Sequence, residues 1–193
     1  MGTSILLLFC VGLSITAGWM VFAWVIARLL NNLSIVDAAW AMAFLPTSFF
    51  LVLFDSDPTF SSYLLTVLMV CWSLRLSVHI SFRIFKHHPQ EDPRYRPLRQ
   101  MFSKNEWLIY LVFFQLQGFV VALLLLPLIV TIVCGPRELS LFQFLATTLA
   151  FLSIGGEWLA DWQLSNFKSK SNEPKAICKN GLWAWSRHPN YFF

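Results

Sequence analysis

Five stretches of predominantly apolar residues follow one another along this chain, and each is long enough to cross the hydrocarbon core of a bilayer as a helix. They cover roughly residues 4–29, 35–54, 62–85, 107–133 and 140–165. Hydrophobic residues make up 57% of the sequence and charged residues only 12%, whereas a soluble domain carries about a quarter charged residues. The predicted fold class is therefore all-α: a polytopic membrane helical bundle of about five transmembrane helices, forming a single domain over residues 1–193.

The short segments between the apolar stretches contain residues that interrupt helices. Asn31 and Asn32 predict a tight turn between the first two spans, and Pro58 separates the second span from the third. Pro127 lies inside the fourth stretch and predicts a kink, which neighbouring helices tolerate in a membrane. The first stretch has no basic segment before it and is too long for the apolar part of a signal peptide, so we interpret it as a retained span.

Lysine and arginine gather in alternate connections. After the third and fifth stretches they are Arg83, Lys86, Arg94, Arg96, Arg99, Lys104, Lys168, Lys170, Lys175, Lys179 and Arg187. The opposite side has only Arg137 outside the spans. The positive-inside rule places the basic segments in the cytosol and the N-terminus in the lumen or outside. Because the basic residues lie between apolar spans, the net charge of +4 does not indicate nucleic acid as a partner.

Ionisable side chains inside spans are costly and are functional candidates by default. They are Asp37 in the second span, Arg75, His79 and Arg83 in the third, and Glu157 and Asp161 in the fifth. All lie towards the predicted cytosolic side, and spacings of four residues place those of the third and fifth spans on single helical faces. Two interpretations remain: a cavity open to the cytosol, or pairing of these charges with one another to fix the helix packing.

The predicted cytosolic loop after the third span combines acids, a cation and a phenol. These are Glu91, Asp92, Arg94 and Tyr95. They indicate either contacts with a ligand or a solvated loop biased towards the membrane surface.

The C-terminal segment is the most specific part of the sequence. Lys168, Lys170 and Arg187 are suited to neutralising phosphates. Asn190 can hydrogen-bond an amide or a ribose, and Tyr191 can stack on a ring or lie at the membrane interface. The alternative is a basic segment bound to anionic lipid. The sequence contains no GxGxxG, so a Rossmann nucleotide site has no support, and no HExxH or CxxC motif, so we predict no metal.

Several motifs together resemble the steroid 5-alpha-reductase-like membrane family, most closely its broad and mostly uncharacterised branch. They are Ser34-Ile35-Val36-Asp37-Ala38-Ala39-Trp40, Trp72-Ser73-Leu74-Arg75-Leu76, Glu91-Asp92-Pro93-Arg94-Tyr95, Asp161, Lys168, Gly181-Leu182-Trp183 and Arg187-His188-Pro189-Asn190-Tyr191. The resemblance extends from about residue 34 to the end of the sequence. The combined motifs are specific, whereas the last one alone also occurs in sterol reductases and in isoprenylcysteine carboxyl methyltransferases.

The resemblance implies an NADPH-dependent reductase of a carbon–carbon double bond in a membrane-dissolved, lipid-like or sterol-like enone. Its partners are that substrate and membrane lipids, and its location is the endoplasmic reticulum if the source is eukaryotic. The candidate cofactor-binding residues are Arg75, Asp161, Lys168, Arg187, His188, Asn190 and Tyr191. The candidate catalytic residues are Asp37, His79 and Tyr95, with the general acid among them left open.

This sequence departs from the steroid-reductase branch at three places. Phe44 occupies the position of a glutamate in that branch, and Ile80 follows His79 where that branch has a tyrosine, so steroid specificity is doubtful. Family members continue after the Asn-Tyr pair with Gly-Glu and further helices, so we expect the chain to be truncated at its C-terminus and to lack its last helices.

Two other functions remain open at this point. One is a membrane methyltransferase that uses S-adenosylmethionine, because such enzymes carry a similar tail. Lys168 and Lys170 favour a phosphate-bearing cofactor instead, since S-adenosylmethionine has no phosphate. The other is a non-catalytic truncated isoform that acts as a partner or regulator.

Overall fold

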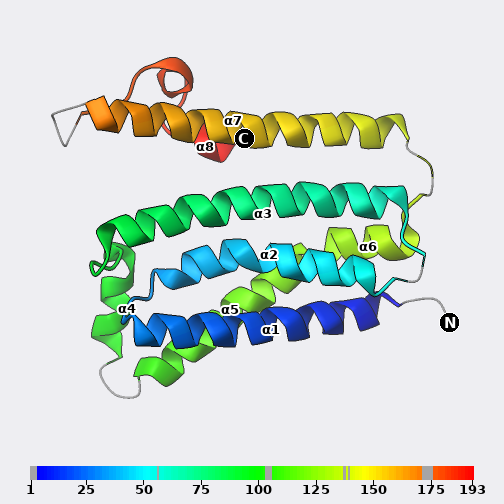
Figure 1. Ribbon diagram of the computed structural model, residues 1–193, viewed down its shortest axis with the longest axis horizontal. Coiled ribbons are helices and arrows are strands. Elements are labelled where there is room, and N and C mark those ends of the chain that lie inside the picture. Colours follow the sequence, from blue (N-terminus) through cyan, green and yellow to red (C-terminus); the bar gives the residue numbers. More distant parts are fainter. Residues whose placement is uncertain (1–3, 56, 103–105, 137, 139, 171–175) are drawn as a thin grey trace. The chain divides into compact units, whose positions relative to one another are not determined.

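The chain is mostly helical in the regions that a computed structural model describes, which are residues 4–55, 57–102, 106–136, 138, 140–170 and 176–193 (Figure 1). No strand occurs in these ranges, so the predicted all-α polytopic bundle is confirmed. Lys104, Arg137 and Lys175, which contribute to the predicted orientation, lie outside the described residues. The chain forms two compact units, Met1–Leu139 and Ser140–Phe193.

The first unit contains most of the helices. They are α1 (Ile5–Leu29), α2 (Ile35–Leu53), α3 (Phe60–His87), the 3-10 turn η1 (Pro93–Tyr95), α4 (Arg96–Met101), α5 (Glu106–Leu124) and α6 (Leu126–Cys134). Among the described residues, four segments are long and apolar enough to cross a membrane: α1, α2, α3 and the α5–α6 pair, Glu106–Cys134. These coincide with the first four predicted spans, and the chain is an integral membrane protein with several passes.

The second unit contains α7 (Leu141–Lys170), the 3-10 turn η2 (Gly181–Ala184) and the short α8 (Pro189–Phe192). Helix α7 contains the fifth predicted span, but it is not among the four segments of sufficient length and hydropathy. Polar side chains such as Gln143, Thr147, Thr148 and Glu157 lower its hydropathy. The fifth predicted span is therefore confirmed as a helix but not as a membrane-spanning segment.

The predicted interruptions in the first unit occur where the sequence places them, including the break at Pro58 between α2 and α3. Asn31 adopts a left-handed conformation with φ of 49°, which asparagine tolerates better than most residues. Helix α5 ends at Leu124 and α6 begins at Leu126, immediately before Pro127. Proline lacks an amide hydrogen, and its ring collides with the carbonyl four residues earlier, so the kink at this position has a direct cause.

Helices α1, α2 and α3 lie side by side, and α5 crosses α1 (Figure 1). Their contacts bury a core that includes Leu8, Met20, Phe44, Tyr110 and Phe114. Figure 1 also shows α4 at the end of this unit where α1 and α3 finish and α2 starts. We call this end the α4 end; it corresponds to the predicted cytosolic side.

The crossing of α1 and α5 depends on a glycine. A Cβ atom at Gly118 would lie 3.0 Å from Met20 Cγ and 3.3 Å from the Thr16 carbonyl oxygen, and both residues are fully buried. We expect Gly118→Val to destabilise the folded chain by about 1 to 3 kcal/mol, since overpacking forces neighbouring groups apart. The measurement is thermal unfolding in detergent, followed by circular dichroism.

Gly18→Val on the facing helix α1 is the matched control, because a Cβ at Gly18 meets nothing within 4 Å. Equal melting temperatures for the two variants would contradict a packing role of Gly118.

Candidate functional site

Two of the three predicted catalytic residues are in direct contact. Asp37 lies in the first turn of α2, and Tyr95 ends η1 with only 8% of its surface exposed. The Tyr95 hydroxyl donates a hydrogen bond to Asp37 Oδ1 at 2.7 Å, and Arg94 Nη2 donates to Asp37 Oδ2 at 2.8 Å. Both carboxylate oxygens of Asp37 therefore have partners that come from a loop more than fifty residues away in sequence.

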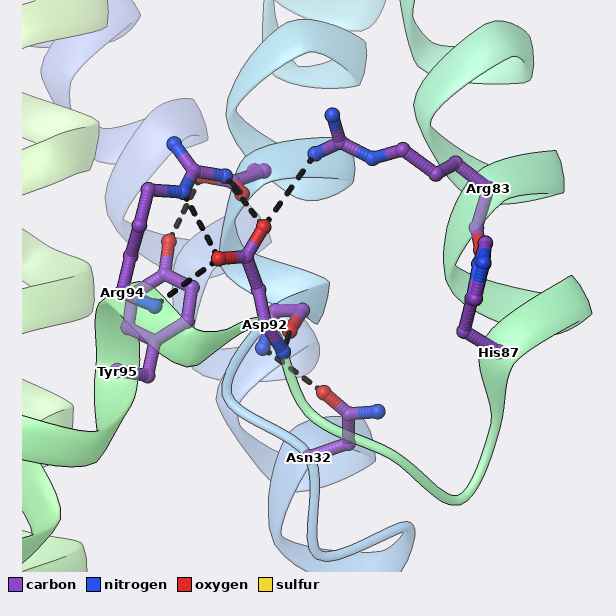
Figure 2. Close-up of polar contacts among 8 residues, drawn as sticks. Asn32, Arg83, His87, Asp92, Arg94 and Tyr95 are labelled. Carbon is purple, nitrogen blue, oxygen red and sulfur yellow. Dashed lines mark hydrogen bonds and ion pairs between the residues drawn. The ribbon is translucent and has the colours of Figure 1, made fainter. Parts of the chain in front are cut away.

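Asp92 organises the loop around this pair. Its side chain caps η1 by accepting from the Arg94 amide, and it also binds the Arg94 guanidinium through Nε and Nη2 at 3.0 Å each. Figure 2 shows Arg83 approaching Asp92 from α3 while Arg94 approaches it from the other side, with Arg83 Nη2 at 3.8 Å. The Asp92 amide in turn donates to Ser34 Oγ at 2.9 Å, which ties the loop to the start of α2.

The charges in this cluster shift the proton affinities of its members. The hydrogen bond from Arg94 is the main reason why the pKa of Asp92 lies below its usual value, and Asp92 in turn raises the pKa of Arg94. Burial, followed by the negative charge of Asp37, raises the pKa of Tyr95. Tyr95 is therefore a protonated phenol at neutral pH, placed beside a carboxylate and a guanidinium. Such a group can donate a hydrogen bond to a ligand oxygen.

A second ion pair holds the same loop in place. Glu91 binds Arg99 through two hydrogen bonds, with Arg99 Nε 2.7 Å from Oε2 and Nη2 3.1 Å from Oε1. Glu91 also accepts from the amide of Leu33 in the α1–α2 turn. The Arg99 guanidinium lies over the rings of Trp107 and Tyr110 at the start of α5. The pair thus connects the loop to three parts of the first unit.

The second unit contains most of the predicted cofactor-binding residues. Asn190 Nδ2 donates to Asp161 Oδ1 at 3.1 Å, so the last helix returns to the middle of α7. The Asn190 Oδ1 atom is buried and has no hydrogen-bond partner among the described residues. The indole of Trp183 donates to the Ala160 carbonyl at 2.8 Å. These contacts bring the predicted Asp161 and Asn190 together.

Gly181 allows this return of the chain. Its φ is 61°, a region that favours glycine, and a Cβ there would meet the Gln163 side chain at 2.5 Å. The Gln163 amide oxygen accepts from the Leu182 amide at 2.9 Å. A residue with a side chain at position 181 would therefore strain the backbone and displace the Gln163 amide from Leu182.

The remaining predicted residues of the second unit lie at its surface. Lys168 and Arg187 are exposed. The rings of His188 and Tyr191 stack with centroids 5.4 Å apart, and Tyr191 is 83% exposed. The exposed surface of the second unit therefore offers two cations and a stacked pair of aromatic rings.

Arg75 and His79 lie on α3, in the first unit. Arg75 is half-buried and His79 is exposed. Of the predicted cofactor-binding residues, Arg75 therefore lies in the first unit, whereas the others, including Asp161 and Asn190, lie in the second.

The sequence indicated that Glu91, Asp92 and Arg94 either contact a ligand or lie in a solvated loop, and the structure shows that they form ion pairs within the protein. It missed Arg99 and Ser34 as their partners. In the sequence, Arg99 is one of many basic residues in the loop. Ser34 is part of the motif that precedes Asp37.

Comparison with known proteins gives one family. Residues 23–193 match a family described as "Protein of unknown function (DUF1295)", and because the match covers most of the chain, the chain belongs to this family. No curated protein matches the chain, and no solved structure matches it.

Proposed function

We propose that this member of the DUF1295 family is an NADPH-dependent reductase of a carbon–carbon double bond in a membrane-dissolved, lipid-like or sterol-like enone. The observation that carries the proposal is the hydrogen bond between the buried Tyr95 hydroxyl and Asp37 Oδ1. Reduction of an enone requires a hydrogen-bond donor at the ketone oxygen, where negative charge develops. The buried and protonated phenol of Tyr95 is suited to donating this hydrogen bond.

The residues around Tyr95 have distinct parts in this reaction. The phenol has a single hydrogen, so it turns from Asp37 Oδ1 to the ketone oxygen when substrate binds, and Arg94 still neutralises Asp37. NADPH, when bound, supplies the hydride that adds to the β-carbon. The π electrons of the double bond would then move towards the oxygen that Tyr95 holds, and the α-carbon would take up a proton from water. One hydride and one proton are consumed, and the product is the saturated ketone.

The second unit has groups that fit a dinucleotide. In the part of the chain that the structure describes, the buried Asn190 Oδ1 has no hydrogen-bond partner, and it suits a donor such as an amide or a ribose hydroxyl. Its position is held by the bond from Asn190 Nδ2 to Asp161. Lys168 and Arg187 are exposed cations that suit phosphates. We therefore assign Asp161, Asn190, Lys168 and Arg187 to NADPH binding, with the α4 end of the first unit on the cytosolic side of the membrane.

The resemblance to the steroid 5-alpha-reductase-like family supports the same chemistry, and it suggests the endoplasmic reticulum as the location in a eukaryotic source. Phe44 is buried and packs against two indole rings, with the Trp40 and Trp72 centroids 5.2 and 5.3 Å away. The polar groups of a steroid would need a carboxylate at this position. The apolar side chain therefore favours a lipid-like enone as the substrate.

Binding of the cofactor provides the first test. We expect the purified chain in detergent to bind NADPH saturably, and Asn190→Ala and Lys168→Glu each to weaken the affinity by roughly 10- to 100-fold. This range corresponds to the loss of one hydrogen bond to a charged group or of one charge pair. Isothermal titration calorimetry measures the affinity, and Lys86→Glu, the same charge change at the end of α3, is the control.

The other functions predict different ligands. Saturable binding of S-adenosylmethionine without NADPH would indicate a methyltransferase and contradict the proposal. Binding of neither ligand would favour a non-catalytic role.

A further inference from the structure

A polar groove lies at the α4 end of the first unit, between the end of α3 and the loop that leads to α4. Its volume is about 490 Å³, within the range of roughly 300 to 1,000 Å³ that is usual for sites of small molecules. Its lining includes Arg83, His87, Gln90, Glu91, Asp92 and Arg96. Neither Asp37 nor Tyr95 belongs to this lining, so the groove is distinct from the proposed donor to the enone.

The two carboxylates in the lining already have partners. Both oxygens of Glu91 accept from Arg99, and both oxygens of Asp92 accept from Arg94. Asp37 shares Arg94 with Asp92. With the two further arginines of the lining, four arginines face three carboxylates among the described residues of this cluster, which therefore keeps one net positive charge. The groove thus favours an anion over a cation.

The two arginines of the lining have hydrogen-bond donors to spare. Arg83 Nη2 lies 3.8 Å from Asp92 Oδ2, which is too long for a hydrogen bond, and the Arg83 side chain is 51% exposed. Arg96 lies at the start of α4 and is exposed, and it forms no ion pair with any other residue in the described ranges. A guanidinium has five N–H donors, so both groups are available to a ligand.

A histidine lies beside Arg83 on α3. His87 Nδ1 is 2.8 Å from the Arg83 carbonyl oxygen. Because a carbonyl oxygen only accepts, Nδ1 carries the hydrogen, and Nε2 is the ring nitrogen that can contact a ligand. Figure 2 shows Arg83 and His87 on α3, with Arg83 extending towards Asp92. The groove therefore offers an arginine and a histidine from α3 and a second arginine from α4.

We propose that this groove binds a phosphomonoester, with the phosphate between Arg83 and Arg96. A tetrahedral phosphate has three terminal oxygens and accepts from two guanidinium groups on different elements, whereas one arginine satisfies a planar carboxylate. The described lining contains no phenylalanine, tyrosine or tryptophan ring on which a base could stack. The phosphate is therefore the recognised group, and its source is either a lipid headgroup or a free phosphorylated metabolite. This site goes beyond the proposed reductase activity, since NADPH is assigned to the second unit.

Calorimetric titration of the full chain in detergent tests the proposal with two probes that carry the same phosphate, glycerol 3-phosphate and short-chain phosphatidic acid. We expect saturable binding of at least one probe, and Arg83→Gln and Arg96→Gln each to weaken it by about 10-fold, as for the loss of one charge-assisted hydrogen bond. Lys86→Gln is the matched control, because Lys86 lies on the same turn of α3 as Arg83 but outside the lining, and we expect a change of less than about twofold.

The two probes distinguish the sources. Binding of phosphatidic acid alone would assign the phosphate to a lipid headgroup, whereas equal binding of glycerol 3-phosphate would assign it to a free metabolite. sn-Glycero-3-phosphocholine is a phosphodiester, and we expect it to bind at least 10-fold more weakly than the better probe.

Four results would overturn the proposal. They are binding of neither probe, equal affinity for the phosphodiester, equal losses in Lys86→Gln and the two arginine variants, and a parallel loss of NADPH affinity in the arginine variants. The third would attribute binding to general surface charge, and the fourth would assign the groove to the cofactor. Failure of NADPH to bind at all would count against the reductase proposal and leave the phosphate titration interpretable.

Discussion

Replacing Tyr95 with phenylalanine is expected to lower kcat for enone reduction by about 10²- to 10³-fold while leaving NADPH affinity unchanged. The substitution removes only the hydroxyl that donates to Asp37 Oδ1 at 2.7 Å, and the ring keeps its contact with Phe113, whose centroid lies 6.4 Å away. Losing one donor aimed at a developing oxyanion typically costs this factor. The rate is measured as the loss of NADPH absorbance at about 340 nm with a series of apolar enones.

Tyr110→Phe is the matched control for this prediction. Tyr110 is also a buried tyrosine whose hydroxyl donates to a carboxylate, at 3.4 Å to Glu106 Oε2, and it has no part in the proposed reaction. We expect Tyr110→Phe to retain activity within about threefold of wild type, since surface and structural changes away from the site rarely alter the transition state. Equal losses in the two variants, or full activity of Tyr95→Phe, would show that Tyr95 is not the donor.

The second large effect concerns the ion pair that holds the loop. We expect Arg99→Gln to destabilise the folded chain by about 3 kcal/mol. This lies between the value of roughly 1 kcal/mol for surface pairs and the roughly 3 to 5 kcal/mol for breaking buried ones. The Arg99 and Glu91 side chains are 25% and 14% exposed, so the remaining carboxylate would be poorly solvated. Arg99 also donates to the Asn31 carbonyl at 3.1 Å, which adds to the loss.

Thermal unfolding in detergent measures the effect, and a loss of about 3 kcal/mol corresponds to roughly 6 to 12 °C for a chain of this size. Arg83→Gln is the control within the same cluster, because Arg83 is 51% exposed and its contact with Asp92 is 3.8 Å long. An exposed pair of this kind contributes less than about 1 kcal/mol. Equal shifts for the two variants would contradict the assigned role of the Glu91–Arg99 pair.

Much of the fold follows from local properties of the sequence. The apolar stretches, the left-handed turn at Asn31 and the break before Pro127 all depend on residues within a few positions of one another. The bounds of α1 and α2 therefore agree with the predicted spans to within a residue. The fifth stretch differs, because the polar residues spread through α7 lower its hydropathy without preventing a helix.

The candidate site could be predicted only in part, because its contacts join residues far apart in sequence. Asp37 and Tyr95 were selected for their side-chain chemistry, but their hydrogen bond spans fifty-eight positions. His79 was selected on the same grounds, and it lies exposed on α3. The partner of Glu91 could not be chosen from the sequence, since the loop offers several arginines at comparable spacing.

The sequence by itself determined that the chain is a helical membrane protein. It also determined which residues inside the spans are too costly to place in lipid unless they have a function. Hydropathy and helix breaking are properties of short segments, so no tertiary information is needed to read them. Only the tertiary structure decided which charges satisfy one another and which donors remain without a partner. Asp37, Asp92 and Arg94 pair among themselves, whereas Asn32 Nδ2 and Asn190 Oδ1 are buried and have no hydrogen-bond partner within the described ranges. Burial and pairing depend on the whole three-dimensional arrangement, and here they distinguish the groups that hold the protein together from those that are available to a ligand.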